Sequence, residues 1–128
     1  MSKVVFDSSA ILALFYNETG KPKVLSLLDE YDPLISAANF CEIVTKLISD
    51  GLVTDVATEM FSGLEIDIID FDAQHAIQAA ELRPITEHLG LSLGDRACLA
   101  LAIQENATAI TADRTWSNLD VCRIVVIR

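Results

Sequence analysis

Short apolar runs alternate with longer segments of helical periodicity along the whole chain, and this alternation limits the folds it can adopt. The strands it predicts are residues 3–6, 34–35, 66–70, 108–111 and 121–127. Parallel strands need a crossover between them, and the intervening segments are long enough to supply helices. We therefore predict an α/β fold with three layers, α/β/α, around a central, mainly parallel sheet.

The segments between the predicted strands carry apolar residues at the spacing of one helix face. The predicted helices are residues 8–16, a segment beginning near Pro22, and residues 39–50, 54–62, 72–82 and 93–106. The inward face expected for 72–82 comprises Ala73, Ala76, Ile77 and Ala80. Residues 93–106 are apolar on nearly every side, which predicts a helix buried in the interior.

The length and composition indicate a single soluble domain. The chain has 128 residues, of which 52% are hydrophobic, so we expect a single domain spanning residues 1–128. No apolar stretch approaches the roughly 20 residues that cross a bilayer, and the N-terminus lacks the pattern of a signal peptide. We expect a cytoplasmic protein that does not contact a membrane.

Four carboxylates lie where strand-like runs give way to helical segments. They are Asp7, Glu42, Asp95 and Asp113. Because the carboxyl ends of parallel strands meet at one edge of a sheet, we expect these acids to lie close together. Crowded carboxylates repel one another, which should raise at least one of their pKa values. Such a cluster predicts a site for a hard divalent cation, Mg²⁺ or Mn²⁺.

Each acid taken alone also has a purely structural explanation, as a helix cap. The capping candidates are Asp7 or Ser8, Asn39 with Glu42, Ser92 with Asp95, and Asp113. The two explanations are compatible, because the dipole at a helix N-terminus helps to keep a carboxylate ionised. The convergence of all four acids at one edge distinguishes a metal site from unrelated caps.

The remaining reactive side chains offer little alternative chemistry. His75 lies in a predicted helix and His88 in a polar loop, so we expect both on the surface rather than as general bases. The three cysteines form no Cys-x-x-Cys pair, which excludes the common zinc and redox motifs. Metal-assisted hydrolysis is the chemistry that these residues support.

Four short segments that contain the acids resemble the motifs of PIN-domain ribonucleases, and most closely those of VapC-type toxins of type II toxin–antitoxin systems. The matching segments are residues 5–10 (VFDSSA), 39–42 (NFCE), 90–97 (GLSLGDRA) and 111–116 (TADRTW). The resemblance covers essentially the whole chain in the right order. Asn118 stands where some members of the family carry a further acid.

The resemblance implies a Mg²⁺- or Mn²⁺-dependent endoribonuclease. Its metal-binding and catalytic residues would be Asp7, Glu42, Asp95 and Asp113. It also implies an RNA substrate, a cognate antitoxin that inhibits the enzyme, and assembly as a homodimer or a toxin–antitoxin hetero-oligomer. The formal net charge of −10 disfavours RNA binding by bulk electrostatics and favours a basic partner segment.

Several neighbours of the acids have expected supporting roles. Ser9 and Thr111 would hold a ligand carboxylate or a water in place, and Asn39 would do the same or cap its helix. Arg96 and Arg114 each follow a site acid, and either contact RNA phosphate or balance the local charge. Hydrolysis by an activated water predicts a 5′-phosphate and a 3′-hydroxyl.

Three other functions compete with this interpretation. A phosphorelay receiver domain is also an acidic α/β domain, but it usually has paired acids after the first strand and a late lysine. Here Asp7 is followed by two serines and the last lysine is Lys46. A haloacid-dehalogenase-type phosphatase would need Asp-x-Asp at the same place. A PIN-fold protein that binds a partner without cleaving RNA is the third alternative.

Overall fold

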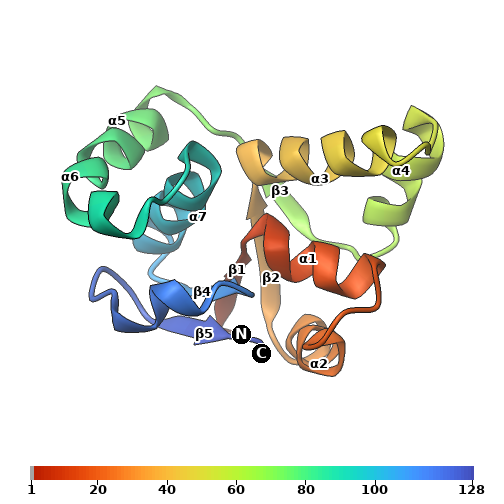
Figure 1. Cartoon of the computed structure of the whole chain (residues 1–128), viewed down its shortest axis with the longest axis horizontal. Helices are drawn as coiled ribbons and strands as arrows, with labels where there is room; N and C mark the ends of the chain where they lie inside the picture. The colour runs from red at the N-terminus through yellow and green to blue at the C-terminus, as the bar shows by residue number, and fades with distance from the viewer. Residues whose placement is uncertain (1) are drawn as a thin grey trace.

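The computed structural model describes residues 2–128 as a central sheet with helices packed on both of its faces (Figure 1). The strands are β1 (Lys3–Phe6), β2 (Asp32–Ser36), β3 (Asp67–Ile69), β4 (Thr108–Thr111) and β5 (Ile124–Val126). The helices are α1 (Ser8–Phe15), α2 (Lys21–Glu30), α3 (Ala37–Ser49), α4 (Thr54–Ser62), α5 (Ala73–Glu81), α6 (Arg83–Thr86) and α7 (Leu93–Gln104), with the 3₁₀ helices η1 (Glu87–Leu89) and η2 (Arg114–Asn118). The predicted three-layer α/β arrangement is confirmed.

The strands form one sheet in the order β3-β2-β1-β4-β5, and every neighbouring pair is parallel. The chain builds outward from β1 to β3 and then returns to place β4 on the other side of β1. The boundary between β1 and β4 is therefore the point where the strand order reverses. In open parallel sheets the crevice at such a point, beyond the carboxyl ends of the strands, is where ligands bind.

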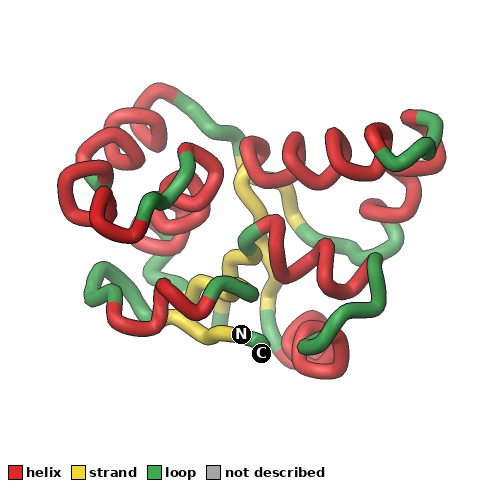
Figure 2. Tube along the Cα trace, viewed as in Figure 1, coloured by secondary structure: helices red, strands yellow, loops and turns green. Residues whose placement is uncertain are grey.

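Each face of the sheet has its own apolar core, because successive side chains of a strand point to opposite faces. Phe6 and Ile110 pack with α1, α2, α3 and α4, whereas Val5 and Ala109 pack against α7 and η2. Figure 2 shows the strands as the middle layer, with helices on either side. The sheet is thus covered on both faces, as expected for parallel strands.

Helix α7 is buried over most of its length, as its sequence predicted, with seven of its twelve residues buried. Residues 97–102 are all buried against the sheet and α5. The helix has 12 residues, and among residues 2–128 no helix combines the length and apolar character needed to cross a bilayer.

Two helices differ from their predictions. Helix α3 begins at Ala37 rather than Asn39, because the side chain of Ser36 accepts a hydrogen bond from the backbone N–H of Ala38 and caps the helix. Helix α5 turns its predicted inward face to solvent, and Ile77 is 63% exposed. It buries His75 and Ala79 against α7 instead, because the polar side chain of His75 finds partners there.

The prediction that His75 lies on the surface is therefore wrong, whereas His88 is exposed as expected. The two ring nitrogens of His75 lie 2.9 Å from the carbonyl oxygen of Asp70 and 2.8 Å from Oε1 of Gln104. These hydrogen bonds offset the cost of burying the imidazole. Helical periodicity of apolar residues alone gives no sign of such partners.

Gly20 packs closely against Ile127, and the contact leaves no room for a side chain at position 20. Its φ of 104° lies in the left-handed region, and an added Cβ would lie 2.7 Å from Cδ1 and 2.9 Å from the carbonyl oxygen of Ile127. Gly51 has nearly the same φ of 105° with no atom within 4 Å of an added Cβ. The two glycines therefore share the backbone strain and differ in the steric clash.

We expect Gly20→Ala to lower the free energy of unfolding by about 1–3 kcal/mol more than Gly51→Ala, which is the usual range for overpacking. Both variants should share a loss of about 1 kcal/mol from the positive φ. Urea denaturation of the two variants and the unsubstituted protein measures the difference. Equal losses would show that Gly20 and Ile127 do not pack as described.

Candidate active site at the carboxyl ends of β1 and β4

Asp7 is the first residue after β1, and Thr111 ends the neighbouring strand β4. The backbone N–H of Asp7 donates to the carbonyl oxygen of Ile110 over 2.8 Å, which fixes the two strand ends side by side. Asp7 is only 2% exposed. The strand pairing thus places a buried carboxylic acid at the reversal point of the sheet.

The two carboxylate oxygens of Asp7 differ in their hydrogen bonding. The hydroxyls of Ser9 and Thr111 donate to Oδ2 over 2.6 and 2.9 Å. Oδ1 is buried and has no hydrogen-bond partner among the described residues. Although Asp7 stands at the N-cap of α1, its side chain makes no capping hydrogen bond. The capping explanation therefore fails here, and a buried acceptor is left for another group.

The pKa of Asp7 is raised from 3.8 to about 6. Burial is the largest cause, because it disfavours the charged form, and the negative charges of Asp95 and Glu42 raise the pKa further. The hydrogen bonds from Ser9 and Thr111 lower it. The predicted rise in pKa within the cluster is present, but desolvation contributes more to it than the mutual repulsion that the sequence indicated.

Glu42 reaches the site from the second turn of α3. The Ser8 hydroxyl and the Asn39 amide nitrogen donate to its Oε1 over 2.9 and 3.0 Å. The same amide nitrogen donates to the carbonyl oxygen of Gly94 over 2.9 Å, which joins α3 to the first turn of α7. Asn39 thus orients a carboxylate rather than capping its helix. Its own Oδ1 is buried without a partner among the described residues.

Gly94 allows this approach of α3 and α7, because an added Cβ would overlap the carboxylate of Glu42. A glycine in the first turn of a helix otherwise lowers helix stability relative to alanine by up to about 1 kcal/mol. A glycine at this position therefore indicates a close approach of another segment, and the predictions from sequence did not include that approach. Ser8, which bonds to Glu42, is a second contact that the sequence analysis missed.

Asp95 and Asp113 both act as helix caps. The carboxylate of Asp95 accepts from the backbone N–H of Ser92 over 2.8 Å, and the backbone N–H of Asp95 donates to the Ser92 hydroxyl over 3.1 Å, which completes a capping box. The carboxylate of Asp113 accepts from the N–H and the hydroxyl of Thr115. The backbone N–H of Asp113 donates to the Thr111 hydroxyl over 3.1 Å and so connects it to the support of Asp7.

Glu42 and Asp95 therefore lie close enough to Asp7 for their charges to raise its pKa. The backbone N–H of Asp113 bonds to Thr111, which in turn bonds to Asp7. In the present side-chain positions, no three His, Cys, Asp or Glu side chains of residues 2–128 form a metal-holding group. The donors nevertheless fit a hard cation, since they are carboxylates and one buried oxygen of Asp7 lacks a partner. Which residues bind an ion stays a prediction.

The two arginines expected near the acids have different surroundings. Arg96 is half-buried, and its Nη1 donates to the carbonyl oxygen of Ala79 over 3.0 Å, which connects α7 to α5. Arg114 is exposed and its Nε donates to the carbonyl oxygen of Arg128 over 2.9 Å. Arg114 is the better placed of the two for contact with a polyanion, because a helix contact already occupies Arg96.

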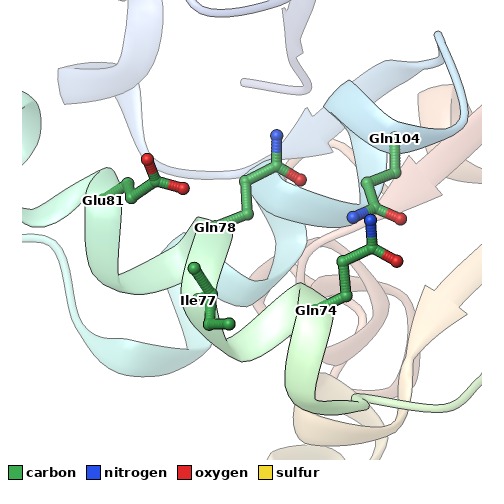
Figure 3. A pocket seen from close by; sticks show the side chains of 5 residues that line it. All are labelled: Gln74, Ile77, Gln78, Glu81 and Gln104. Carbon is green, nitrogen blue, oxygen red and sulfur yellow. The ribbon is translucent and has the colours of Figure 1, made fainter.

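A pocket of about 500 Å³ lies on the side of α5, away from the acids. It is lined by Gln74, Ile77, Gln78, Glu81 and Gln104, which Figure 3 shows in close view. None of the predicted site residues lines it. Its size does not make it the active site, since the perturbed carboxylate and the reversal point of the strand order lie elsewhere.

The raised pKa of Asp7 predicts an unusual pH dependence of stability in metal-free protein. A protonated Asp7 favours the folded state, so its contribution to stability is fully present below pH 3.8 and is lost as the pH rises through about 6. The loss is on the order of 3 kcal/mol. Asp7→Asn should remove it, so the variant should gain stability relative to the unsubstituted protein between pH 4 and pH 7.

Urea denaturation in EDTA at both pH values measures this gain, and any loss from the substitution that does not depend on pH cancels in the comparison. Asp120→Asn is the matched control, because Asp120 is exposed and outside the site. A stability difference between Asp7→Asn and the unsubstituted protein that stays constant from pH 4 to pH 7 would contradict the raised pKa.

Comparisons with known proteins agree with this architecture. Solved structures that match over nearly their full length include a chain of VapBC2 from Rickettsia felis bound to promoter DNA, with a TM-score of 0.74, 20% identity, and coverage of 98% of this chain and 99% of the other. DNA-bound VapBC from Salmonella typhimurium matches with a TM-score of 0.74, 17% identity and complete coverage of both chains.

Mycobacterium tuberculosis VapC20, described as a toxin that cleaves the sarcin–ricin loop, matches with a TM-score of 0.73, 16% identity, and coverage of 94% of this chain and 98% of the other. A search of curated proteins finds no match. At these identities the structures establish the fold. A model of the PIN domain matches residues 4–121, which is most of the chain. The chain therefore belongs to the PIN-domain family.

Proposed function

We propose that this protein is a Mg²⁺- or Mn²⁺-dependent endoribonuclease that acts as the toxin of a toxin–antitoxin pair. The observation that carries the proposal is the state of Asp7, an acid buried at the reversal point of the sheet with one oxygen unpartnered. Two further acids, Glu42 and Asp95, lie near enough to raise its pKa. Such an arrangement is costly without a cation, and its likeness to nucleases of the family supports the same role here.

The residues proposed to hold the ion are Asp7, Glu42, Asp95 and Asp113. When bound, a divalent cation lowers the pKa of water and offsets negative charge on the phosphate. The Ser9 and Thr111 hydroxyls keep Oδ2 of Asp7 oriented, so that Oδ1 faces the ligand. The amide of Asn39 and the hydroxyl of Ser8 do the same for Glu42.

The proposed reaction is hydrolysis of a phosphodiester bond. The oxygen of a water bonds to phosphorus, the bond from phosphorus to the 3′ oxygen breaks, and the products are a 5′-phosphate and a 3′-hydroxyl. The carboxylates need to be ionised to act in this way. Because the pKa of Asp7 is raised to about 6, an ion that binds at or below that pH displaces a proton from the site.

The strand order disfavours the receiver-domain alternative. This sheet has the order 3-2-1-4-5, whereas the flavodoxin-like sheets to which receiver domains belong have the order 2-1-3-4-5. The family match also favours a PIN domain over a receiver or a phosphatase. A PIN-fold protein that binds without cleaving RNA is the alternative that the activity assay below decides.

The proposed protein partner is a cognate antitoxin, since solved neighbours of this fold are toxin–antitoxin complexes, among them one from Klebsiella pneumoniae. Exposed apolar side chains are available for such a contact or for a homodimer: Leu25 is 48% and Val56 is 44% exposed. Co-expression with a candidate antitoxin, followed by size-exclusion chromatography, tests the partner. Separate elution of the two products would count against it.

The activity itself is tested with purified protein and a labelled RNA. We expect cleavage with Mg²⁺ or Mn²⁺, none with EDTA, and a loss of at least about 100-fold in rate for Asp7→Asn or Asp95→Asn, because each removes a charge that the ion needs. Asp120→Asn is the matched control and should cleave normally.

Full activity in Asp7→Asn or Asp95→Asn, or cleavage that persists in EDTA, would remove the basis of the proposed mechanism. A protein that binds RNA or a partner but shows no cleavage with either metal would favour the catalytically silent alternative.

A further inference from the structure

The last residues of the chain lie at the same edge of the sheet as the acids. In the parallel pair β4 and β5, Thr111 is in register with Val126, and the backbone N–H of Ile127 donates to the carbonyl oxygen of Thr111 over 2.9 Å. Parallel strands end at a common edge, so two residues later Arg128 lies near Asp113. The position of Arg128 depends on this register, which the sequence alone does not give.

Arg128 and Arg114 line a pocket of about 470 Å³ that adjoins the carboxylates. The other lining residues are Ser9, Ala112 and Asp113. Ser9 belongs to both places, because its hydroxyl donates to Oδ2 of Asp7 over 2.6 Å. The backbone N–H of Ala112 donates to the same hydroxyl over 3.0 Å and fixes that wall. A ligand group in the pocket would therefore be a close neighbour of one at Asp7.

The guanidinium groups of Arg114 and Arg128 each make one hydrogen bond and have further N–H donors available. The carbonyl oxygen of Arg128 accepts from Nε of Arg114 over 2.9 Å, and Nη1 of Arg128 lies 3.1 Å from Oε1 of Glu18. The hydrogen bonds of residues 2–128 engage no other guanidinium nitrogen of these two arginines. The side chains in the Glu18 pair are 49% and 34% exposed, so the pair is weak and water or an anion competes with it.

Two of the nine basic residues of a chain with net charge −10 thus converge beside the acidic site. Among the side chains that line the pocket, Asp113 is the one that carries a negative charge. The planar guanidinium matches the geometry of phosphate and forms paired hydrogen bonds with it. An arginine pair at this position provides the local positive charge that RNA needs to approach a strongly acidic protein.

We infer that this pocket binds a backbone phosphate of the RNA strand adjacent to the phosphate that is cut, with Arg114 and Arg128 as the contacting residues. The inference rests on the proposed nuclease function of the neighbouring acids. RNA is favoured over a peptide carboxylate because a strand that places one phosphate at Asp7 carries another beside it, and Ser9 connects the pocket wall to Asp7. Arg128 is then a substrate-positioning residue of this protein.

The test measures RNA binding without metal, so that it does not depend on cleavage. The probe is a fluorescein-labelled single-stranded RNA of mixed sequence, followed by fluorescence anisotropy in EDTA at several salt concentrations. The test variant is Arg114→Gln with Arg128→Gln. The control is Arg83→Gln with Arg123→Gln, which changes the net charge equally at two exposed arginines away from the pocket.

We expect the test variant to bind RNA at least tenfold more weakly than the unsubstituted protein. The slope of log K against log salt should flatten by about 0.7, because the variant loses its contact with one phosphate. The control variant should keep its affinity within about twofold and its slope, because a general change of charge does not remove a phosphate contact. A merely structural role of the arginines would leave the slope unchanged.

A second pair, Arg114→Lys with Arg128→Lys, keeps the charge and guards against a variant that fails to fold. It should retain the salt slope but bind about threefold more weakly, since lysine lacks the paired donors. Unchanged affinity and slope in the glutamine variant, or equal loss in the control, would overturn the inference. If the protein does not cleave RNA with Mn²⁺ yet loses binding in the test variant only, the nuclease proposal fails and the phosphate site stands.

Discussion

The burial of one acid at the reversal point of the sheet is the constraint on which the rest of this site depends. Asp7 is fixed there by β1 and by its pairing with β4, and desolvation raises its pKa to about 6. Ionising it at neutral pH therefore opposes folding by roughly 3 kcal/mol, a sizeable fraction of the stability of a small domain. The hydroxyls of Ser9 and Thr111 offset part of this through one oxygen only. The other oxygen has no partner among residues 2–128 and is available to the proposed cation.

The residues around Asp7 have structural roles that are compatible with the proposed metal binding. Asp95 and Asp113 close the ends of α7 and η2, so they remain satisfied when no ion is bound. Glu42 is held by Asn39, which also joins α3 to α7 through Gly94. Carboxylates at helix N-termini stay ionised more readily because of the helix dipole. Capping and metal binding are therefore compatible explanations of these acids. A carboxylate that caps a helix in the absence of an ion could exchange its capping hydrogen bond for a bond to the proposed ion.

Much of this could be read from the sequence, since alternating apolar runs and helical segments define the layers, and the acids after the runs define the edge. What failed depended on contacts between distant segments. Asn39 has the spacing of a cap, yet Ser36 takes that role, because β2 runs directly into α3. His75 is buried because Gln104 lies opposite it. Arg128 is visible in the sequence as a basic residue, but only the register of β5 places it beside Asp113. Periodicity reports which face of an element is apolar, and it does not report which polar groups find partners across the core.

The central claim is that one divalent ion binds at Asp7, and crystals grown with Mn²⁺ test it most directly. An anomalous difference map recorded near the manganese absorption edge locates the ion without reference to the protein geometry. The account predicts a peak at the carboxylates of Asp7 and Asp95, on the side of Asp7 that carries Oδ1. A map with no peak there, or with manganese bound only at the surface acids of residues 67–72, would contradict it.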